Sequence, residues 1–325
     1  TKEQILENFD PSQPGLADAT IFGLPFSAEQ SEIIVIPVPW EVTVSYGSGA
    51  SKGPDAVLDA SFQVDLNHQE FPELWKLGIY IDKPAKELKK KSKKFKKQAA
   101  PIIKALESGM ILDHHPSLMK DLEEINYACS DMVEAVREQT LNWMNQGKKV
   151  VLLGGDHSTP LGYYQALATK YDNFGILHLD AHMDLRIAYE GFTYSHASIM
   201  YNTLQIPQVS KIVQVGIRDF CEQEVEVALK DRVLVHTDSD LKQEAFEGKT
   251  WQQQCDNIIA SLPDKVCISF DIDGMYSWYC PNTGTPVPGG FSFEQATYLF
   301  NRLAETNKEI IGFDLVEVAP GKDDW

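Results

Sequence analysis

Six side chains of the kinds that bind metal ions lie in three short stretches of the sequence. They are His157, Asp180, His182, Asp184, Asp271 and Asp273. Each stretch follows an apolar run of the kind that forms a strand buried on both faces. Buried carboxylates without a partner are costly, so clustered charge at such strand ends must be neutralised. Two divalent cations would neutralise it, and this mixture of carboxylates and imidazoles suits a pair of Mn²⁺ ions, which favour oxygen and accept nitrogen.

Such a pair of ions predicts hydrolytic chemistry. Two metals that lie close together can share and deprotonate a water, which supplies a hydroxide nucleophile at neutral pH. The spacing favours a single site. Asp180, His182 and Asp184 alternate in sequence, so on an extended strand end they would share one face, and Asp271 and Asp273 would do the same.

The apolar runs belong to a longer alternation of strands and helices. Strands are expected near 33–36, 150–153, 175–179, 212–217, 233–236, 266–273 and 310–317. Helices are expected near 55–58, 122–146, 160–170, 222–230, 251–261 and 292–308, and beyond His196. This alternation predicts an α/β fold, a single domain over residues 1–325 whose parallel sheet is covered by helices on both faces. Ligands of such sheets bind at the carboxyl ends of the strands, where all six side chains are expected.

Two segments of the N-terminal half carry further expectations. Residues 1–30 are polar and contain proline, so we expect them to wrap the surface, and the strand at 33–36 should end at Pro37. The stretch Lys86–Lys97 is dense in lysine. It is either a basic patch for an anionic partner or, as we favour, the solvated face of an amphipathic helix.

Seven segments together resemble the ureohydrolase family, which includes arginase, agmatinase and formiminoglutamase. Besides the three metal-type stretches they are Ser45–Pro54, Val215–Arg218, Thr283–Gly290 and Asp314–Pro320. The resemblance implies the arginase-like three-layer α/β/α fold. It also implies hydrolysis of the C–N bond of a guanidine or amidine at a site with two Mn²⁺ per chain, and a trimeric or hexameric assembly.

The resemblance also implies a role for each ligand. One metal would take His157, Asp180, Asp184 and Asp271. The other would take His182, Asp180, Asp271 and Asp273. Asp180 and Asp271 would therefore bridge the two ions, and the hydroxide that they share would attack the guanidine carbon.

Three side chains are expected to act on the substrate. His196, in the segment 192–198, resembles the family's proton shuttle, and a group that titrates near neutrality is a natural donor to a leaving amine. Glu317 resembles the glutamate that holds the guanidinium, because a carboxylate and a planar cation pair well through two hydrogen bonds. Asp184 is expected to be catalytic as well as a ligand.

Other polar residues near the motifs are given supporting roles. Asp156 is expected to accept hydrogen bonds beside the metal site or to cap a turn rather than to ligate. His178, inside its strand, is expected to be a core histidine bonded to backbone. Asp314 should join a structural network. Tyr276 stands where the family usually has a third aspartate, so the loop 275–280 is expected to differ.

The substrate is left open between several guanidines. The segment Tyr194–Met200 resembles agmatinases, which favours agmatine, whereas Arg186 resembles the carboxylate-binding arginine of formiminoglutamases. If Glu190 or another acid neutralises Arg186, agmatine fits; otherwise arginine or another guanidino acid fits. A catalytically silent homologue that binds cations, or a zinc deacetylase on the same kind of sheet, are alternatives that the intact ligand set disfavours.

Composition narrows the partners. The net charge of −18 disfavours nucleic acid and anionic membranes and favours a small cationic substrate. Five dispersed cysteines indicate reduced thiols in a cytoplasmic compartment. The sequence has no apolar run of the length that spans a membrane and no apolar N-terminal signal, so a cytoplasmic location is expected.

Overall fold

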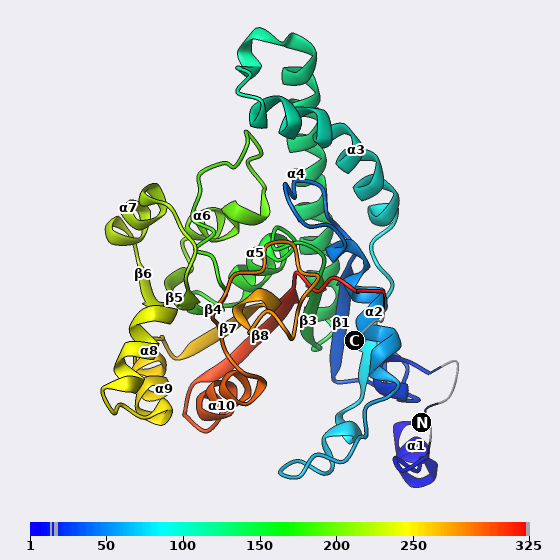
Figure 1. Cartoon of the computed structure of the whole chain (residues 1–325). Coiled ribbons are helices and arrows are strands. Elements are labelled where there is room, and N and C mark those ends of the chain that lie inside the picture. Colours follow the sequence, from blue (N-terminus) through cyan, green and yellow to red (C-terminus); the bar gives the residue numbers. More distant parts are fainter. Residues whose placement is uncertain (14, 16–18, 323–325) are drawn as a thin grey trace.

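The computed structural model describes residues 1–13, 15 and 19–322. A sheet of eight strands, all paired in parallel, runs through the molecule in the order β2-β1-β3-β8-β7-β4-β5-β6 (Figure 1). The strands are β1 (Ile33–Val38), β2 (Ile79–Ile81), β3 (Lys149–Gly154), β4 (Phe174–Leu179), β5 (Val209–Ile217), β6 (Val233–Thr237), β7 (Lys265–Asp271) and β8 (Glu309–Val316). The predicted α/β class with a parallel sheet is confirmed.

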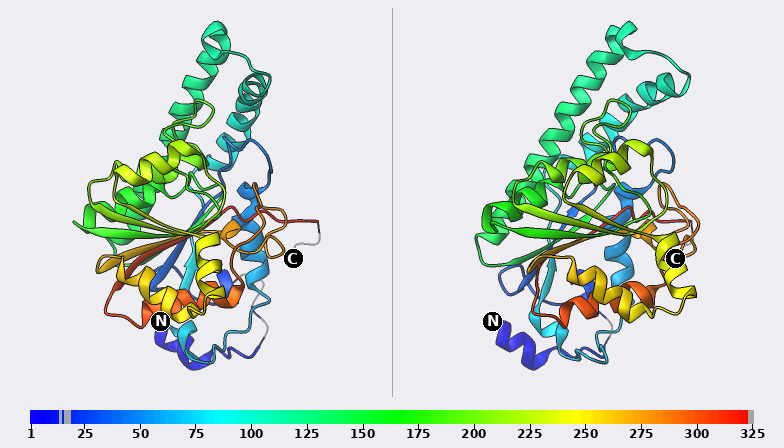
Figure 2. Two further views of the ribbon diagram at one scale, coloured as in Figure 1. Left: turned by 60° about the vertical axis from the view of Figure 1, so that its left-hand side comes forward. Right: turned by 90° about the vertical axis from the view of Figure 1, so that its left-hand side faces the viewer.

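Helices cover both faces of this sheet (Figure 2). The α-helices are α1 (Lys2–Asn8), α2 (Gly53–Ser61), α3 (Leu88–Glu107), α4 (Pro116–Met144), α5 (Leu161–Lys170), α6 (Ile199–Leu204), α7 (Glu222–Lys230), α8 (Asp238–Phe246), α9 (Trp251–Ala260) and α10 (Phe293–Ala304). The larger core cluster joins α3, α4, α5 and α6 to one face, and a second cluster joins α9 and α10 to the other. Every residue of β4 is buried, as expected of a central parallel strand.

The strand order explains how distant parts of the sequence meet. β3, β8, β7 and β4 are consecutive neighbours in the sheet, although they are far apart in the chain. Because the strands are parallel, their carboxyl ends lie at one edge, where ligands of such sheets bind. The residues that follow these four strands therefore converge, and they include His157, Glu317, Asp273 and Asp180.

Several predicted boundaries are wrong. β1 continues through Pro37 to Val38, because β2 pairs only with residues 33–35 and leaves Pro37 with a strand partner on one side alone. α4 begins at Pro116, whereas the predicted helix began at Leu122. The strand expected to reach Asp273 ends at Asp271, and a 3₁₀ turn over Ile272–Gly274 follows.

Some elements lacked a prediction. α1, α8 and the short strand β2 were not expected from the sequence pattern. Within the segment expected to wrap the surface, Leu24 and Phe26 are buried in a small cluster with Trp75. The lysine-dense stretch does form an amphipathic helix, since α3 buries Leu88 and Ser92. α3 and α4 form the helical projection at the top of Figure 1. None of the described helices is long and apolar enough to cross a membrane.

Candidate metal centre

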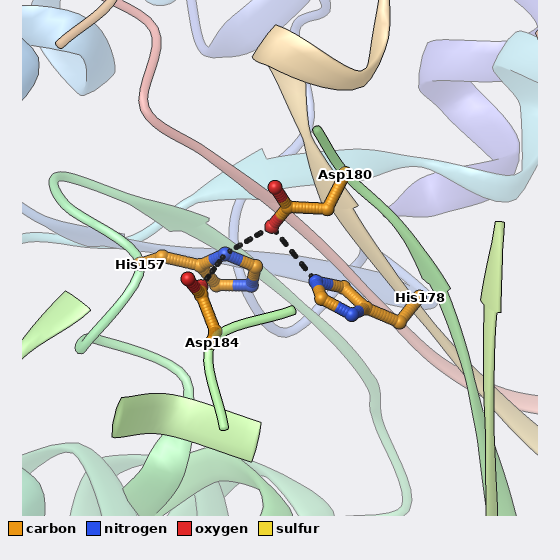
Figure 3. A group of neighbouring side chains, drawn as sticks. All are labelled: His157, His178, Asp180 and Asp184. Carbon is orange, nitrogen blue, oxygen red and sulfur yellow. Dashed lines mark hydrogen bonds and ion pairs between the residues drawn. The ribbon is translucent and has the colours of Figure 1, made fainter. Parts of the chain in front are cut away.

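All six metal-type side chains come together at the carboxyl ends of β3, β4 and β7. Figure 3 shows part of this cluster, with His157 and Asp184 beside Asp180. His157 Nδ1 lies 3.0 Å from Asp180 Oδ2, 3.1 Å from Asp184 Oδ2 and 3.2 Å from Asp271 Oδ2. His182 Nδ1 lies 3.1 Å from Asp273 Oδ2 and 3.3 Å from Asp180 Oδ1. One carboxylate, Asp180, thus faces both histidines.

The hydrogen bonds around His157 place its proton on Nε2, so that Nδ1 carries a free lone pair. Its Nε2 lies 3.0 Å from Ser269 Oγ, and Ser269 Oγ donates its own proton to Asp314 Oδ1 at 3.0 Å. Ser269 must therefore accept from His157 Nε2–H. Nδ1 then faces carboxylate oxygens, and within the described residues it has no hydrogen-bond partner. A lone pair among carboxylates is repelled unless a cation lies between them, so the donor set fits a metal ion.

His178 has a different role from the one predicted. It is buried, as expected, but it bonds to side chains rather than to backbone. Gln214 Nε2 donates both to Met183 O, at 2.6 Å, and to His178 Nδ1, at 3.0 Å. His178 Nε2–H is then the donor to Asp180 Oδ2, at 2.8 Å (Figure 3). Both ring nitrogens are engaged, so His178 orients the carboxylate of Asp180 and has no ring nitrogen free for a metal ion.

The charges of the cluster do not balance. Burial together with the charge of Asp180 raises the pKa of Asp184 to about 7. Burial and the charges of Asp273 and Asp180 raise the pKa of Asp271 well above its usual value. Carboxylates shift in this way where negative charge exceeds the positive charge that the surrounding protein supplies. Divalent cations would relieve this excess, which is a second sign that the donor set fits metal.

Turns, rather than an extended strand end, aim the ligands. β4 ends at Leu179, and Asp184 has a left-handed backbone with φ of +54°. The expected single face of Asp180, His182 and Asp184 is therefore wrong. Asp180 Oδ1 instead accepts the amide of His182, at 2.6 Å, and Asp271 Oδ1 accepts the amide of Asp273, at 2.8 Å. Each such turn brings two ligands of one stretch toward the same point.

Glu317 lies in the same cavity as the cluster. The cavity measures about 140 Å³ and is lined by Ser45, His157, His182, Asp184, Arg186, Tyr189, His196, Ala197, Asp219, Phe220, Glu224, Asp271, Asp273, Thr285 and Glu317. Glu317 follows β8 with φ of +61°, and its Oε1 accepts the amide of His157 at 2.9 Å. Its Oε2 is buried without a hydrogen-bond partner among the described residues. Burial and the charge of Asp156 raise the pKa of Glu317 well above its usual value.

Asp156 and Asp314 support the cluster without entering it. Asp156 Oδ1 accepts the amide of Ser158 at 3.0 Å, and Oδ2 accepts the amide of Val42 at 3.3 Å, so Asp156 caps the turn before the ligands. Asp314 accepts from Ser269, as described above, and from Tyr164 Oη at 2.8 Å. Both were expected to act in this way.

The far wall of the cavity is formed by loops. Arg186 Nε lies 3.8 Å from Glu224 Oε2, and its guanidinium carbon lies 4.9 Å from the centre of the Tyr189 ring. The acid beside Arg186 is therefore Glu224 and not Glu190. Glu224 is also tied to backbone, because its Oε1 accepts the amide of Leu185 at 3.1 Å. Arg186 is 37% exposed at this wall.

His196 occupies the same wall as Arg186. Its Nδ1 lies 3.3 Å from Ser195 Oγ, and the ring meets Tyr189 edge to face at 6.0 Å. Its Nε2 is then the nitrogen available to a ligand. Burial in the cavity, with the neighbouring His182 and His157, lowers the pKa of His196 to about 4, so the ring is neutral at pH 7 and the expected titration near neutrality is wrong.

Sequence reasoning missed how three residues shape the site. His178 and Glu224 are described above. Arg218 donates from Nη2 to the carbonyls of Asp273, at 2.7 Å, and Val287, at 3.0 Å, which ties the loop after β7 in place. Glu224 could have been found from its position three residues after Cys221, since this spacing is that of a capping box. Tyr276, which stands where the family usually has a third aspartate, stacks on Trp278 with ring centres 4.2 Å apart.

Comparison with known proteins assigns the family. The sequence model of the Arginase family matches residues 31–325. The chain is 30% identical over 295 residues to the N(1)-aminopropylagmatine ureohydrolase of Thermus thermophilus, covering 90% of this chain and 84% of that protein. It is 27% identical over 293 residues to the agmatinase of Neisseria meningitidis, covering 89% of this chain and 80% of that protein.

Solved structures show the same fold. The agmatine ureohydrolase of Thermoplasma volcanium superposes with a TM-score of 0.68 at 22% identity, covering 98% of this chain and 89% of the other. The proclavaminate amidino hydrolase of Streptomyces clavuligerus gives a TM-score of 0.72 at 21% identity, covering 95% of this chain and 91% of the other. With the match over 31–325, the chain belongs to the arginase family, as a hydrolase that acts on the C–N bonds of amidines or guanidines.

Proposed function

We propose that this chain hydrolyses agmatine to putrescine and urea, with two Mn²⁺ ions held by the six-ligand cluster. The observation that carries the proposal is the position of Glu317, whose buried carboxylate shares one small cavity with the cluster and leaves Oε2 unpartnered. A guanidinium is planar and cationic, so it would satisfy that oxygen through a charge-assisted hydrogen bond.

The two ions would be held as the resemblance implies. His157 and Asp184 would bind one ion only, and His182 and Asp273 would bind the other ion only. Asp180 and Asp271 would bind both ions. Asp180 faces both histidines, as a bridging ligand must. When bound, a pair of such ions lowers the pKa of a shared water and supplies a nucleophile at neutral pH.

The protein's own residues would orient the substrate and move the proton. Glu317 would hold the guanidinium so that its carbon faces the cluster, which makes the attack effectively intramolecular. Asp184, at the cluster, would accept a hydrogen bond from the attacking water. His196 lines the cavity and is neutral at pH 7, so it would first accept a proton on Nε2 and then pass that proton to the amine that leaves.

The charge of the cavity favours a cationic tail. With the cluster carboxylates neutralised by the two ions, the cavity would keep three acids, Asp219, Glu224 and Glu317, against a single arginine, Arg186. Arg186 is opposed by Glu224 and lies over Tyr189, so its charge is partly offset. An α-carboxylate would meet little net positive charge here, whereas the ammonium of agmatine would be attracted by Glu224 and Asp219.

The test is a kinetic panel on Mn²⁺-loaded protein. Urea or ammonia release is measured with agmatine, arginine, 4-guanidinobutyrate and formiminoglutamate, on wild type and on Arg186→Ala. We expect agmatine to have the highest kcat/KM in both proteins. The proposal fails if a carboxylated substrate is best in the wild type and loses its advantage in Arg186→Ala, which would assign an arginase-like or formiminoglutamase-like activity. Absence of any turnover by loaded protein would instead favour a silent cation-binding homologue.

A second candidate substrate is N(1)-aminopropylagmatine. The Thermus thermophilus relative that carries this name is 30% identical to the chain. The cavity also reaches the exposed residues Asp219 and Phe220, which are 66% and 43% exposed, so a longer polyamine tail could extend past them. N(1)-aminopropylagmatine is therefore added to the panel as a fifth compound, and a kcat/KM above that for agmatine would favour it.

A further inference from the structure

A buried carboxylate outside the cluster organises one wall of the cavity. Glu41 follows β1 and its side chain is 1% exposed. Its Oε1 accepts the amide of Gly49 at 3.0 Å, and its Oε2 accepts the amide of Ser51 at 3.0 Å. Both oxygens thus hold the backbone of the glycine-rich segment 45–53, which folds back on Glu41.

Helix α3 supplies the partners that Glu41 needs. Ser92 Oγ accepts the amide of Glu41 at 2.9 Å, and Lys96 Nζ pairs with Glu41 Oε1. Lys96 Nζ also donates to Ser48 Oγ at 2.5 Å. Ser92 and Lys96 are four residues apart, so they lie on the same face of α3. Figure 1 shows the segment after β1 running beside this helix.

The segment that Glu41 holds reaches the candidate active site. Ser45 lines the same cavity as the cluster and Glu317. Two residues later the amide of Gly47 donates to Gly284 O at 3.0 Å. A side chain at Gly47 would collide with Gly284, since its Cβ would lie 2.4 Å from that carbonyl oxygen. The contact joins the glycine-rich segment to the loop that carries Thr285, another lining residue.

We propose that Lys96 is a positioning residue for substrate binding, which acts through Glu41 to hold the segment 45–53 as a wall of the active-site cavity. This inference rests on the proposed function only in taking the cavity to be the substrate site. Lys96 touches neither the cluster nor Glu317 within the described contacts, so its effect passes through Glu41 and the two amides that Glu41 holds.

The energetics favour a strong dependence on Lys96. A buried carboxylate is costly unless it is both paired and hydrogen-bonded. Burial acts to raise the pKa of Glu41, but the hydrogen bonds from Lys96 and from the Ser51 amide outweigh it and hold the pKa below its usual value. Without Lys96 the charged form would lose its cation, and protonation would weaken the acceptor of both amides.

This role separates Lys96 from the other lysines of the dense stretch. Lys89, Lys90 and Lys91 pair with acids while remaining 53%, 83% and 44% exposed, and such surface pairs contribute little. Lys97, next to Lys96, is exposed. Lys96 is the member of the stretch whose partner is a buried acid. The helix therefore does more than present a solvated face.

The experiment compares four variants of the Mn²⁺-loaded full chain. Lys96→Met removes the cation, Lys96→Arg retains it, and Lys97→Met is the matched control on the same helix. Glu41→Gln with Lys96→Met removes both charges but keeps an amide oxygen as an acceptor. The readouts are hydrogen exchange of the peptide 44–52, metal content, and kcat and KM for the best substrate of the guanidine panel.

We expect Lys96→Met to exchange the peptide 44–52 about 10-fold faster, the effect of losing one charged hydrogen bond. KM should rise about 10-fold, because a smaller fraction of the protein has the wall in place, while kcat and metal content change little. Lys97→Met should match the wild type. Lys96→Arg and the double variant should exchange more slowly than Lys96→Met.

Two results would overturn the inference. One is unchanged exchange of 44–52 in Lys96→Met. The other is faster exchange with an unaltered KM, which would make the contact merely structural. If Lys96→Met does not fold, the double variant, whose glutamine keeps one acceptor oxygen for two amides, must still exchange the peptide 44–52 faster than Lys96→Arg, or the inference is wrong. A wild type that turns over no guanidine would refute the proposed function and leave exchange to decide the role of Lys96.

Discussion

The two ends of the cavity are built in different ways. At the cluster end, the side chains follow directly on strands that are neighbours in the sheet, and Asp180 and His157 are 0% and 1% exposed. At the far wall, Arg186 and Asp219 come from loops and are 37% and 66% exposed. The first end depends on strand order and the second on contacts between loops and helices. If the proposed function is right, the sheet sets the reaction class and the loops set the choice of substrate.

The far wall is held by helix α4. Asn126, on α4, donates from Nδ2 to Gly191 O at 3.1 Å and accepts the amide of Thr193 at 2.9 Å. Gly191 has φ of +80°, and a Cβ there would lie 2.8 Å from Leu122 of the same helix. The turn at Gly191 thus rests on α4 and carries Tyr189, which lies between Arg186 and His196.

The largest expected effect is at the cluster end. Asp180→Ala or Asp271→Ala should disrupt both metal sites, because each side chain is expected to bridge, and should lower kcat on the order of 10⁴-fold, the scale of losing several kcal/mol of metal stabilisation. The measurement is elemental analysis with steady-state kinetics. Asp59→Ala, at an exposed position of α2, is the control and should retain both ions. Loss of a single ion in Asp180→Ala would argue against bridging.

The second-largest effect on kcat is expected at His196, which lies between the cluster and the far wall. His196→Asn should lower kcat roughly 10²-fold, as expected when a general acid or base is removed. Metal content should stay unchanged, because His196 is not one of the six ligands. Turnover at the wild-type rate with a full metal content would exclude His196 from proton transfer.

A smaller effect is expected behind the cluster. His178→Ala removes the donor that orients Asp180, so Mn²⁺ affinity should fall about 10- to 100-fold, and excess Mn²⁺ should restore activity. His178→Gln retains a hydrogen-bond donor, so its Mn²⁺ affinity should lie between that of His178→Ala and that of the wild type. Titration calorimetry measures the affinity. An unaltered affinity in His178→Ala would mean that Asp180 does not need this hydrogen bond.

The smallest effect is expected at the far wall. Asn126→Ala should lower the free energy of unfolding by about 1 kcal/mol, the usual contribution of a lost hydrogen bond, with both ions retained. It should also lower kcat/KM several-fold and change the ranking of substrates in the guanidine panel, because Tyr189 loses its support. Asn142→Ala, at an exposed position of α4, is the control. If the two variants rank substrates alike, α4 has no influence on specificity.

The cluster end, and the presence of Arg186 and His196 in the cavity, could be predicted from the sequence, whereas the contacts that hold the far wall could not. Apolar runs that end in Asp and His at short spacing imply buried strands and a shared charge problem, and these are local signals. The support of the site is not local. His178 was read as bonded to backbone because Gln214 is on another strand, and Glu224 and Asn126 are brought to the loop by tertiary contacts.

Predictions of side-chain direction from strand periodicity failed where a single backbone angle decides the outcome. Asp184 and Glu317 both adopt positive φ, at +54° and +61°, which period-two reasoning does not anticipate. Each lies where a strand or its continuation turns toward the cavity. Such conformations are uncommon for residues other than glycine and tend to cluster at functional sites.

The most direct test of the account is the number of metal ions that the wild-type chain binds. The geometry around His157 Nδ1 and His182 Nδ1, with Asp180 facing both, predicts two Mn²⁺ per chain in calorimetric titration and in elemental analysis of the loaded protein. A stoichiometry of one ion per chain, or none, would contradict the account.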